Sequence, residues 1–205
     1  MLAQKSIAEF LNETASSSPV PGGGSIAALS GAIAAALTEM VANLTVGKKG
    51  YENVQEDMPS IIKITEEYRH SFIRDIDEDA ESFNKFMIAL KMPKSSEEEI
   101  KIRKEAIEKA SKEAALVPLK VAKDALKLMD TVEEIVIKGN KNAITDGAVA
   151  AMMARTAVLS ALYNVKINLL SIKDEMFVHK ISKEVEEIEG KALEREKEIL
   201  SKVVL

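Results

Sequence analysis

The chain is poor in two residue types, Cys and His, that enzymes often use for nucleophilic or metal chemistry. Its 205 residues include no Cys and only two His, His70 and His179. The absence of Cys excludes disulfides and thiolate chemistry. The two His residues lie far apart in the sequence and form no local zinc motif, so we expect surface or packing roles for both. A Ser-His-Asp triad would have to use one of them.

Other shortages narrow the class of protein further. Nine Gly and five Pro are too few for a fibrous or low-complexity chain, and 46% hydrophobic residues are too many for a disordered one. A net charge of −5 argues against a nucleic-acid partner, which would require a basic excess. Polar residues interrupt the N-terminus and the apolar stretch 26–46, so we expect no signal peptide and no membrane span. We therefore expect a single cytoplasmic domain over residues 1–205.

The hydrophobic pattern is helical, and no alternating run bounded by turn residues indicates a strand. Ser6 and Glu9 form a capping box that opens a short first helix. Longer helices are predicted over residues 26–46, 59–90, 97–138, 143–171 and 174–203. As one helix, residues 97–138 would span about 60 Å, so we expect Pro118 to kink or divide it. These patterns predict an all-α, antiparallel bundle of five to seven helices.

The helix predicted over residues 26–46 carries unusually small side chains. The small residues along it are Ala27, Ala28, Gly31, Ala34, Ala35 and Ala42. Such a helix lets its neighbours approach closely, which is typical of the centre of a bundle or of a subunit interface. We therefore expect a homodimer.

One carboxylate lies on the apolar stripe of the helix predicted over residues 59–90. Asp79 follows Ile76 by three residues and precedes Phe83 by four. A carboxylate on a buried face is costly unless it is paired. Asp79 therefore either pairs with a core Lys or Arg or serves in acid–base chemistry with a shifted pKa. Its neighbours are predicted to be surface residues: Asp75, Asp77, Glu78 and Glu81.

A second polar set lies in and before the helix predicted over residues 143–171. Asn140 precedes it, and Asp146, Asn164 and Asn168 share one of its faces. Asp146 and Asn164 are five turns apart, about 27 Å, so they mark two sites unless a dimer brings opposite ends together. Asp146 could instead be a favourable charge at a helix start. The two later Asn side chains could simply bridge helices by hydrogen bonds.

Pro21, Gly22, Gly23, Gly24 and Ser25 stand directly before the small-residue helix. Three glycines permit positive φ angles and close approach of a ligand. Free N–H groups at a helix start can hold an anion or a carbonyl oxygen. No strand precedes this run and no Gly-Lys-Ser/Thr follows, so neither dinucleotide nor Walker motifs apply. The alternative is a plain flexible connector.

Lys48, Lys49 and Tyr51 follow the far end of the same helix. Lysines at a helix C-terminus are favourable for the helix dipole alone. Their functional use would be to stabilise developing negative charge or to bind a substrate carboxylate.

The run SPVPGGGSIAAL at residues 18–29 resembles the opening signature of the cyclodeaminase/cyclohydrolase family, the C-terminal domain of formiminotransferase-cyclodeaminase. The usual family form is close to TPGGGSxAA. Further blocks match in order at residues 44–49, at 79–83 leading to 92–93, and at 139–146 followed by 164–169. The sequence departs from the family at Val20 and Gly50, which removes no group assigned to chemistry.

The resemblance implies a dimeric all-α enzyme that acts on one-carbon derivatives of tetrahydrofolate. It would cyclise 5-formimino-tetrahydrofolate to 5,10-methenyl-tetrahydrofolate with loss of ammonia, or hydrolyse the methenyl compound to 10-formyl-tetrahydrofolate. Both reactions move protons at a carbon between two nitrogens, a task that suits carboxylates and a cation. The folate is the substrate, and we expect no permanently bound cofactor and no metal.

Under this interpretation the candidate catalytic residues are Lys48, Asp79 and Asp146. The candidate substrate-binding residues are Pro21, Gly22, Gly23, Gly24, Ser25, Lys49, Tyr51, Asn140, Asn164 and Asn168. The competing interpretation is a non-catalytic folate-binding or scaffold dimer. The loss of Asp79, Lys48 or Asp146 would mark such a protein, and all three are present.

Overall fold

The computed structural model describes residues 1–204, and those residues form helices and connecting turns without any strand. The α-helices are α1 (Ile7–Thr14), α2 (Gly23–Asn43), α3 (Met58–Leu90), α4 (Glu97–Lys138), α5 (Ile144–Leu169) and α6 (Glu175–Ser201). Short 3-10 turns occupy Leu2–Gln4, Glu52–Val54 and Lys141–Ala143. The predicted all-α bundle is confirmed.

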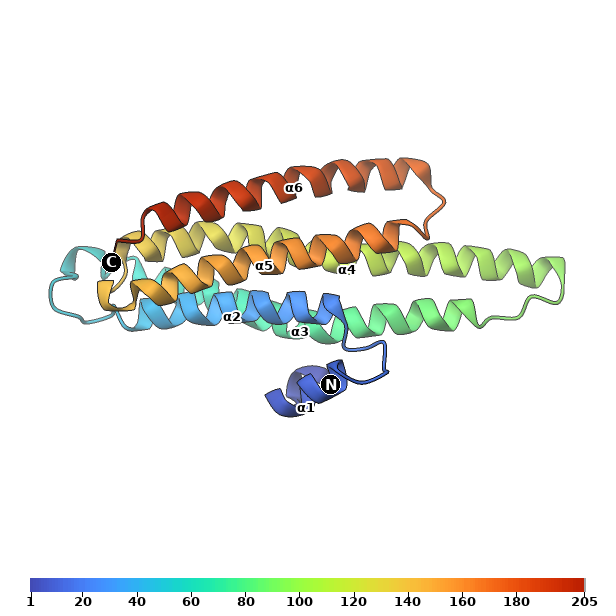
Figure 1. Cartoon of the computed structure of the whole chain (residues 1–205), viewed down its shortest axis with the longest axis horizontal. Helices are drawn as coiled ribbons and strands as arrows, with labels where there is room; N and C mark the ends of the chain where they lie inside the picture. Colours follow the sequence, from blue (N-terminus) through green and yellow to red (C-terminus); the bar gives the residue numbers. More distant parts are fainter. Residues whose placement is uncertain (205) are drawn as a thin grey trace.

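The long helices run along a common direction and share one main core. In Figure 1, α2 and α5 lie side by side and antiparallel, α3 and α4 lie behind them, and α6 lies outside α4 and α5. Buried side chains from α2 to α6 form this core, including Phe72, Leu128 and Leu162. The end of α3 and the start of α4 extend beyond the other helices as a two-helix arm (Figure 1).

Capping residues begin several helices where the sequence predicts them. The Ser6 hydroxyl accepts a hydrogen bond from the Glu9 backbone N–H, and the Glu9 carboxylate accepts one from the Ser6 N–H. Ser96 and Glu99 repeat this arrangement at the start of α4. Each box satisfies N–H groups that have no partner within the helix. These two predicted starts are confirmed.

The start of α2 differs from the prediction. The helix begins at Gly23, with Gly22 as its N-cap, so two of the three glycines lie inside its first turn. Among residues 1–204, positive φ angles occur only at Gly47 and Gly50. The expectation that the PGGGS run uses positive φ is therefore wrong. Its glycines serve by lacking a side chain where α3 and α5 approach the start of α2.

Pro118 is expected from the sequence to kink or divide the fourth helix. The division does not occur, because α4 continues as one helix from Glu97 to Lys138. Proline has no N–H, so it leaves the carbonyl four residues earlier without its usual donor. That carbonyl belongs to Ala114, and the Asn168 side-chain amide of α5 donates to it at 2.7 Å. A neighbouring helix thus supplies the hydrogen bond that proline removes.

Two helical segments, Gly23–Asn43 and Lys141–Leu169, are long and apolar enough to cross a membrane by length and composition alone. Core helices of a bundle pass the same test. The most apolar 18-residue windows of the two segments are 61% and 44% buried within the protein. We therefore interpret both as core helices whose outer faces remain apolar.

Candidate functional site

Asp79 of α3 lies directly against the start of α2. A Cβ atom placed on Gly24 would lie 2.0 Å from Asp79 Oδ1, so only glycine allows this approach. The Ser25 hydroxyl donates to Asp79 Oδ2 at 2.9 Å and lies 3.1 Å from the Ile76 carbonyl oxygen. The glycine run and the stripe carboxylate, which the sequence singled out separately, therefore form one cluster.

Burial raises the pKa of Asp79 above its ordinary value, while hydrogen bonds from the Ser25 hydroxyl and backbone N–H partly oppose this shift. The side chain is only partly buried, so a ligand can reach it. No Lys or Arg within residues 1–204 forms an ion pair with Asp79. The alternative in which a core cation neutralises this carboxylate is therefore wrong. A carboxylate with a raised pKa is a stronger proton acceptor than an ordinary one.

The cation-paired carboxylate in this region is Asp75, one helical turn before Asp79. Asp75 is 1% exposed, which contradicts the prediction that it lies on the surface. Both of its oxygens accept hydrogen bonds from Lys120 Nζ of α4, at 2.8 and 2.9 Å. A buried carboxylate needs such a partner, and Lys120 therefore serves the packing of α3 against α4.

Asn164 of α5 flanks the same helix start from the other side. A Cβ on Gly23 would lie 3.1 Å from Asn164 Nδ2, and this amide also donates to the Ser160 carbonyl at 2.8 Å. Asn168, one turn later, makes the helix-bridging bond to Ala114. One of the two Asn residues thus lies at the Asp79 cluster, whereas the other has the bridging role that the sequence left open.

The remaining candidates gather at the opposite end of α2. The Tyr51 hydroxyl accepts a hydrogen bond from the Lys141 N–H at 2.8 Å. The Asn140 side chain donates to the Leu44 carbonyl at 3.1 Å, and its backbone N–H donates to the Thr45 hydroxyl at 2.9 Å. These bonds hold the loop after α2 against the start of α5, where Asp146 lies.

The Asp79 cluster and the candidate residues at the opposite end of α2 are far apart within one chain. From Gly24 to Asn43 the axis of α2 rises about 28 Å, so Lys48, which follows α2, cannot reach Asp79. Asp146 and Asn164 are likewise separated along the unbroken helix α5. The separation predicted from the sequence is confirmed. In addition, no three His, Asp or Glu side chains in the described part of the chain converge to hold a metal ion.

Comparison with known proteins identifies the family. The sequence model described as formiminotransferase-cyclodeaminase matches residues 6–187. The chain belongs to this family. The PGGGS run, Asp79 and Asn164 all lie within the matched range, so the cluster at the start of α2 is part of the shared domain.

Individual relatives agree with this membership. Methenyltetrahydrofolate cyclohydrolase of Methylorubrum extorquens is 39% identical over 91% of this chain and 89% of its own length. Formimidoyltransferase-cyclodeaminase of rat is 32% identical over 93% of this chain, which spans only 36% of that longer protein. The crystal structure of formiminotetrahydrofolate cyclodeaminase from Thermotoga maritima superposes with a TM-score of 0.88 at 35% identity, covering 99% of this chain and 98% of that one.

Sequence reasoning missed the specific partner of Asp79. Ser25 was a candidate only as part of the glycine run, and its hydrogen bond to Asp79 joins residues 54 positions apart. Helical spacing places residues on one face of their own helix but does not say which helix that face meets. The available signal was that both motifs contain a small or polar residue at a position where a large apolar one would pack.

Proposed function

We propose that this protein catalyses a ring-closing or ring-opening step on a one-carbon derivative of tetrahydrofolate. In the ring-closing reaction, N10 attacks the formimino carbon carried by N5 and ammonia leaves, giving the 5,10-methenyl compound. In the ring-opening reaction, water adds to the methenyl carbon, the bond to N5 breaks, and 10-formyl-tetrahydrofolate forms. Relatives named for each reaction support the proposal at 35% and 39% identity.

The observation that carries the proposal is the partly buried carboxylate of Asp79, which has no cationic partner among residues 1–204 and lies against the glycines at the start of α2. Both reactions pass through a tetrahedral carbon between two nitrogens, and both need one proton removed and another delivered. Asp79 can accept the proton from N10 or from water and return it to the departing ammonia or to N5. Free N–H groups of Gly23 and Gly24 at the start of α2 can hold a carbonyl oxygen of the substrate.

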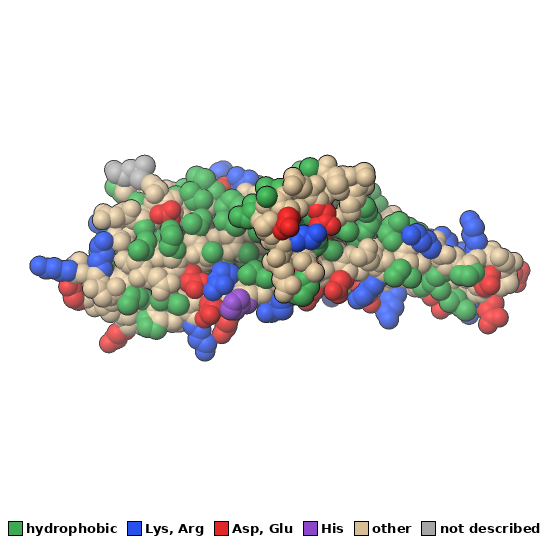
Figure 2. Space-filling model, turned by 90° about the horizontal axis from the view of Figure 1, so that it is seen from below, with side chains coloured by type: hydrophobic (Ala, Val, Ile, Leu, Met, Phe, Trp, Pro, Cys, Tyr) green, Lys and Arg blue, Asp and Glu red, His purple; other side chains and the backbone are tan. Residues whose placement is uncertain are grey.

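The site would be completed by a second copy of the chain. We propose a homodimer through the outer face of α2 and α5, which lie toward the viewer in Figure 1. From below, as in Figure 2, hydrophobic side chains are mixed with many charged ones. Glu39 is the one charged residue of α2, and it forms an ion pair with Arg69. The rest of the outer face of α2 is therefore uncharged. The exposed hydrophobic residues of this face include Ile33, Met40, Leu44, Val149, Met152, Tyr163 and Ile167.

Antiparallel packing of two copies would bring together the candidate residues at the two ends of α2. A two-fold axis perpendicular to the helices would place the end that carries Lys48, Lys49 and Asp146 of one copy over the Asp79 end of the other. Lys48 would then stabilise negative charge, and Asp146 would supply the second carboxylate. Apolar patches of this extent usually mark interfaces in soluble proteins. We propose a cytoplasmic location and a small-molecule folate partner.

Dimerisation is tested by light scattering at micromolar concentration. The wild-type protein should give about twice the chain mass of 22.4 kDa. Ile33→Asp on the outer face of α2 should give monomers with retained helicity and greatly reduced turnover. Ile137→Asp, at an even more exposed apolar position on α4, should leave both mass and turnover unchanged. A wild-type monomer with full turnover would refute the shared site.

The activity is tested by offering 5-formimino- and 5,10-methenyl-tetrahydrofolate separately and following the absorbance of the methenyl group. A cyclodeaminase should make this absorbance rise with the first compound, and a cyclohydrolase should make it fall with the second. The same experiment therefore chooses between the two reactions. Rates that match the enzyme-free control with both compounds would contradict the proposal and favour a non-catalytic folate-binding protein.

A further inference from the structure

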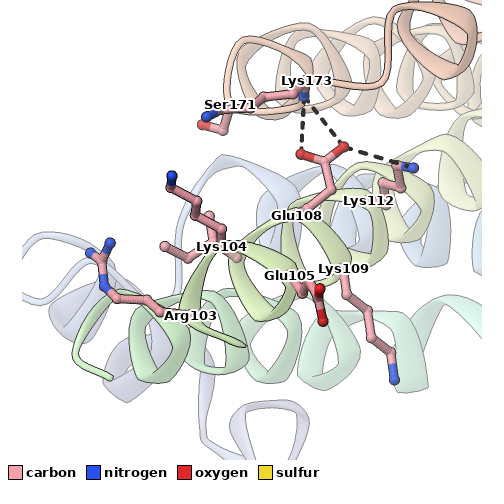
Figure 3. A pocket seen from close by; sticks show the side chains of 9 residues that line it. Arg103, Lys104, Glu105, Glu108, Lys109, Lys112, Ser171 and Lys173 are labelled. Carbon is pink, nitrogen blue, oxygen red and sulfur yellow. Dashed lines mark hydrogen bonds and ion pairs between the residues drawn. The ribbon is translucent and has the colours of Figure 1, made fainter. Parts of the chain in front are cut away.

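A basic groove lies between the start of α4 and the turn that joins α5 to α6 (Figure 3). Its volume is about 730 Å³, and its lining includes Arg103, Lys104, Glu108, Lys112 and Lys173. The chain as a whole carries a net charge of −5, so this concentration of cations is a local exception. A groove of this size is large enough for part of a small-molecule ligand.

The groove has two carboxylates, Glu105 and Glu108, against five basic side chains, and Glu108 already has partners. Glu108 accepts hydrogen bonds from the backbone N–H groups of Lys173 and Asp174, at 3.0 and 3.1 Å. Lys112 pairs with Asp174 at 2.7 Å and lies 5.3 Å above the Phe177 ring. These contacts fix the start of α6 against α4. The groove therefore has a defined wall rather than a loose surface of charges.

Two lysines at the groove keep their charge available. Within the described residues 1–204, neither Lys104 nor Lys173 has an ion-pair partner at its ammonium group. Figure 3 shows Lys104 extending from α4 toward Ser171. Arg103 is engaged differently, because it donates to the Leu90 carbonyl at the end of α3. The groove can thus receive an anionic group between Lys104 and Lys173.

A smaller cavity of about 50 Å³ adjoins the groove, with Ser171 bordering both. Its walls include Phe83, Phe86 and Ser111. Ser111 is 2% exposed, and its hydroxyl has no hydrogen-bond partner among the described residues. Buried hydroxyl groups almost always have partners, so one that lines a cavity and has none indicates a missing ligand atom.

Cavity and groove continue from the Asp79 cluster along two helices. On α3, Asp79 is followed by Phe83 and Phe86 after four and seven residues. Ser171, seven residues after Asn164, lies just beyond the end of α5. Seven residues correspond to about 10 Å of helix, so the smaller cavity lies about two turns from the Asp79 carboxylate. A benzene ring followed by an amide bridges a comparable distance.

We propose that the groove binds the glutamate carboxylates of the folate substrate and that the adjoining cavity receives only the carbonyl oxygen of its benzoyl amide. This assignment rests on the proposed function, which places the one-carbon unit at Asp79. The Ser111 hydroxyl donates to the amide carbonyl, and Lys104 and Lys173 bind the carboxylates. The ring between them lies along Phe83 and Phe86, whose faces favour an aromatic neighbour.

Binding of 4-aminobenzoyl-glutamate, measured by titration calorimetry, tests the groove without any reaction. Lys104→Gln should weaken binding by about fivefold to twentyfold, since it removes one partly exposed charged contact. Ser111→Ala should weaken it by about threefold to tenfold while the melting temperature stays equal or rises. The matched controls Lys127→Gln and Ser30→Ala should bind as the wild type does, because Lys127 is an exposed lysine of α4 outside the groove and Ser30 bonds its own helix.

A kinetic arm separates this proposal from the proposed function. Lys104→Gln should raise KM for the complete folate substrate and leave KM unchanged for the analogue that lacks glutamate. If the wild type binds no 4-aminobenzoyl-glutamate at millimolar concentration, or if Lys104→Gln and Lys127→Gln behave alike, the groove assignment is wrong. If the wild type turns over no folate derivative, the proposed function fails, whatever the calorimetry shows.

Discussion

Replacing Gly24 by Ala tests how closely Asp79 depends on the start of α2. The added Cβ would lie 2.0 Å from Oδ1 and 2.5 Å from Cγ of Asp79. Non-bonded heavy atoms pack at about 3.5 Å, so the carboxylate or the helix start has to move by about 1.5 Å. The clash involves a short side chain held by Ser25, which has little freedom to swing away.

Gly24→Ala is expected to reduce kcat strongly while the protein still folds. Misplacement of a reacting group by about 1 Å can cost a factor of about 10² in rate. We therefore expect kcat of Gly24→Ala to fall at least about 10²-fold. Alanine in a helix is favoured over glycine by about 0.5–1 kcal/mol, whereas overpacking costs about 1–3 kcal/mol. The net destabilisation should stay below about 3 kcal/mol, so the bundle should still fold.

Turnover is followed with the folate substrate that the wild type accepts, and folding is followed by circular dichroism on the same preparation. Gly23→Ala is the matched control, because its Cβ would meet the end of the Asn164 amide at 3.1 Å rather than a carboxylate at 2.0 Å. Its kcat should fall less than about tenfold. Wild-type turnover in Gly24→Ala, or an equal loss in both variants, would refute the reasoning.

Two further predictions follow from the hydrogen bonds. Ser25→Ala removes a donor that lowers the pKa of Asp79, so the limb of the kcat/KM profile that reports Asp79 should move to higher pH; a limb that stays or moves down would show that Ser25 does not set this pKa. Asn168→Ala should destabilise the protein by about 1–3 kcal/mol in chemical denaturation, because the Ala114 carbonyl loses its donor. The loss should be smaller in a Pro118→Ala background, where residue 118 regains its N–H, and equal losses in both backgrounds would contradict this account.

Local sequence signals predicted the helices well where they describe a single helix. The Ser6 and Ser96 capping boxes each set a helix start through residues three positions apart. The expected division of the helix at Pro118 did not occur, because the effect of this proline depends on another helix. The amide that compensates for the missing N–H comes from Asn168, fifty residues later, and nothing near Pro118 indicates it.

The candidate site shows the same limit. The stripe position of Asp79 correctly indicated a carboxylate facing the interior, but the same reasoning placed Asp75 on the surface. Asp75 is buried because Lys120 of α4 reaches it, and helical spacing within α3 carries no information about α4. The glycines were recognised as sites of close approach, yet their φ angles are ordinary. The approaching group is a side chain, not a turn of the backbone.

Replacement of Asp79 by Asn tests the central claim most directly. Burial raises the pKa of Asp79 in the folded state, so ionisation opposes folding as the pH rises above the ordinary Asp range. Asn removes this cost and keeps the shape, so the melting temperature at pH 7 should be equal or higher. If Asp79 transfers the proton, kcat should fall by about 10²–10⁴ with little change in substrate affinity. Wild-type kcat in Asp79→Asn, measured on the same preparation, would contradict the account.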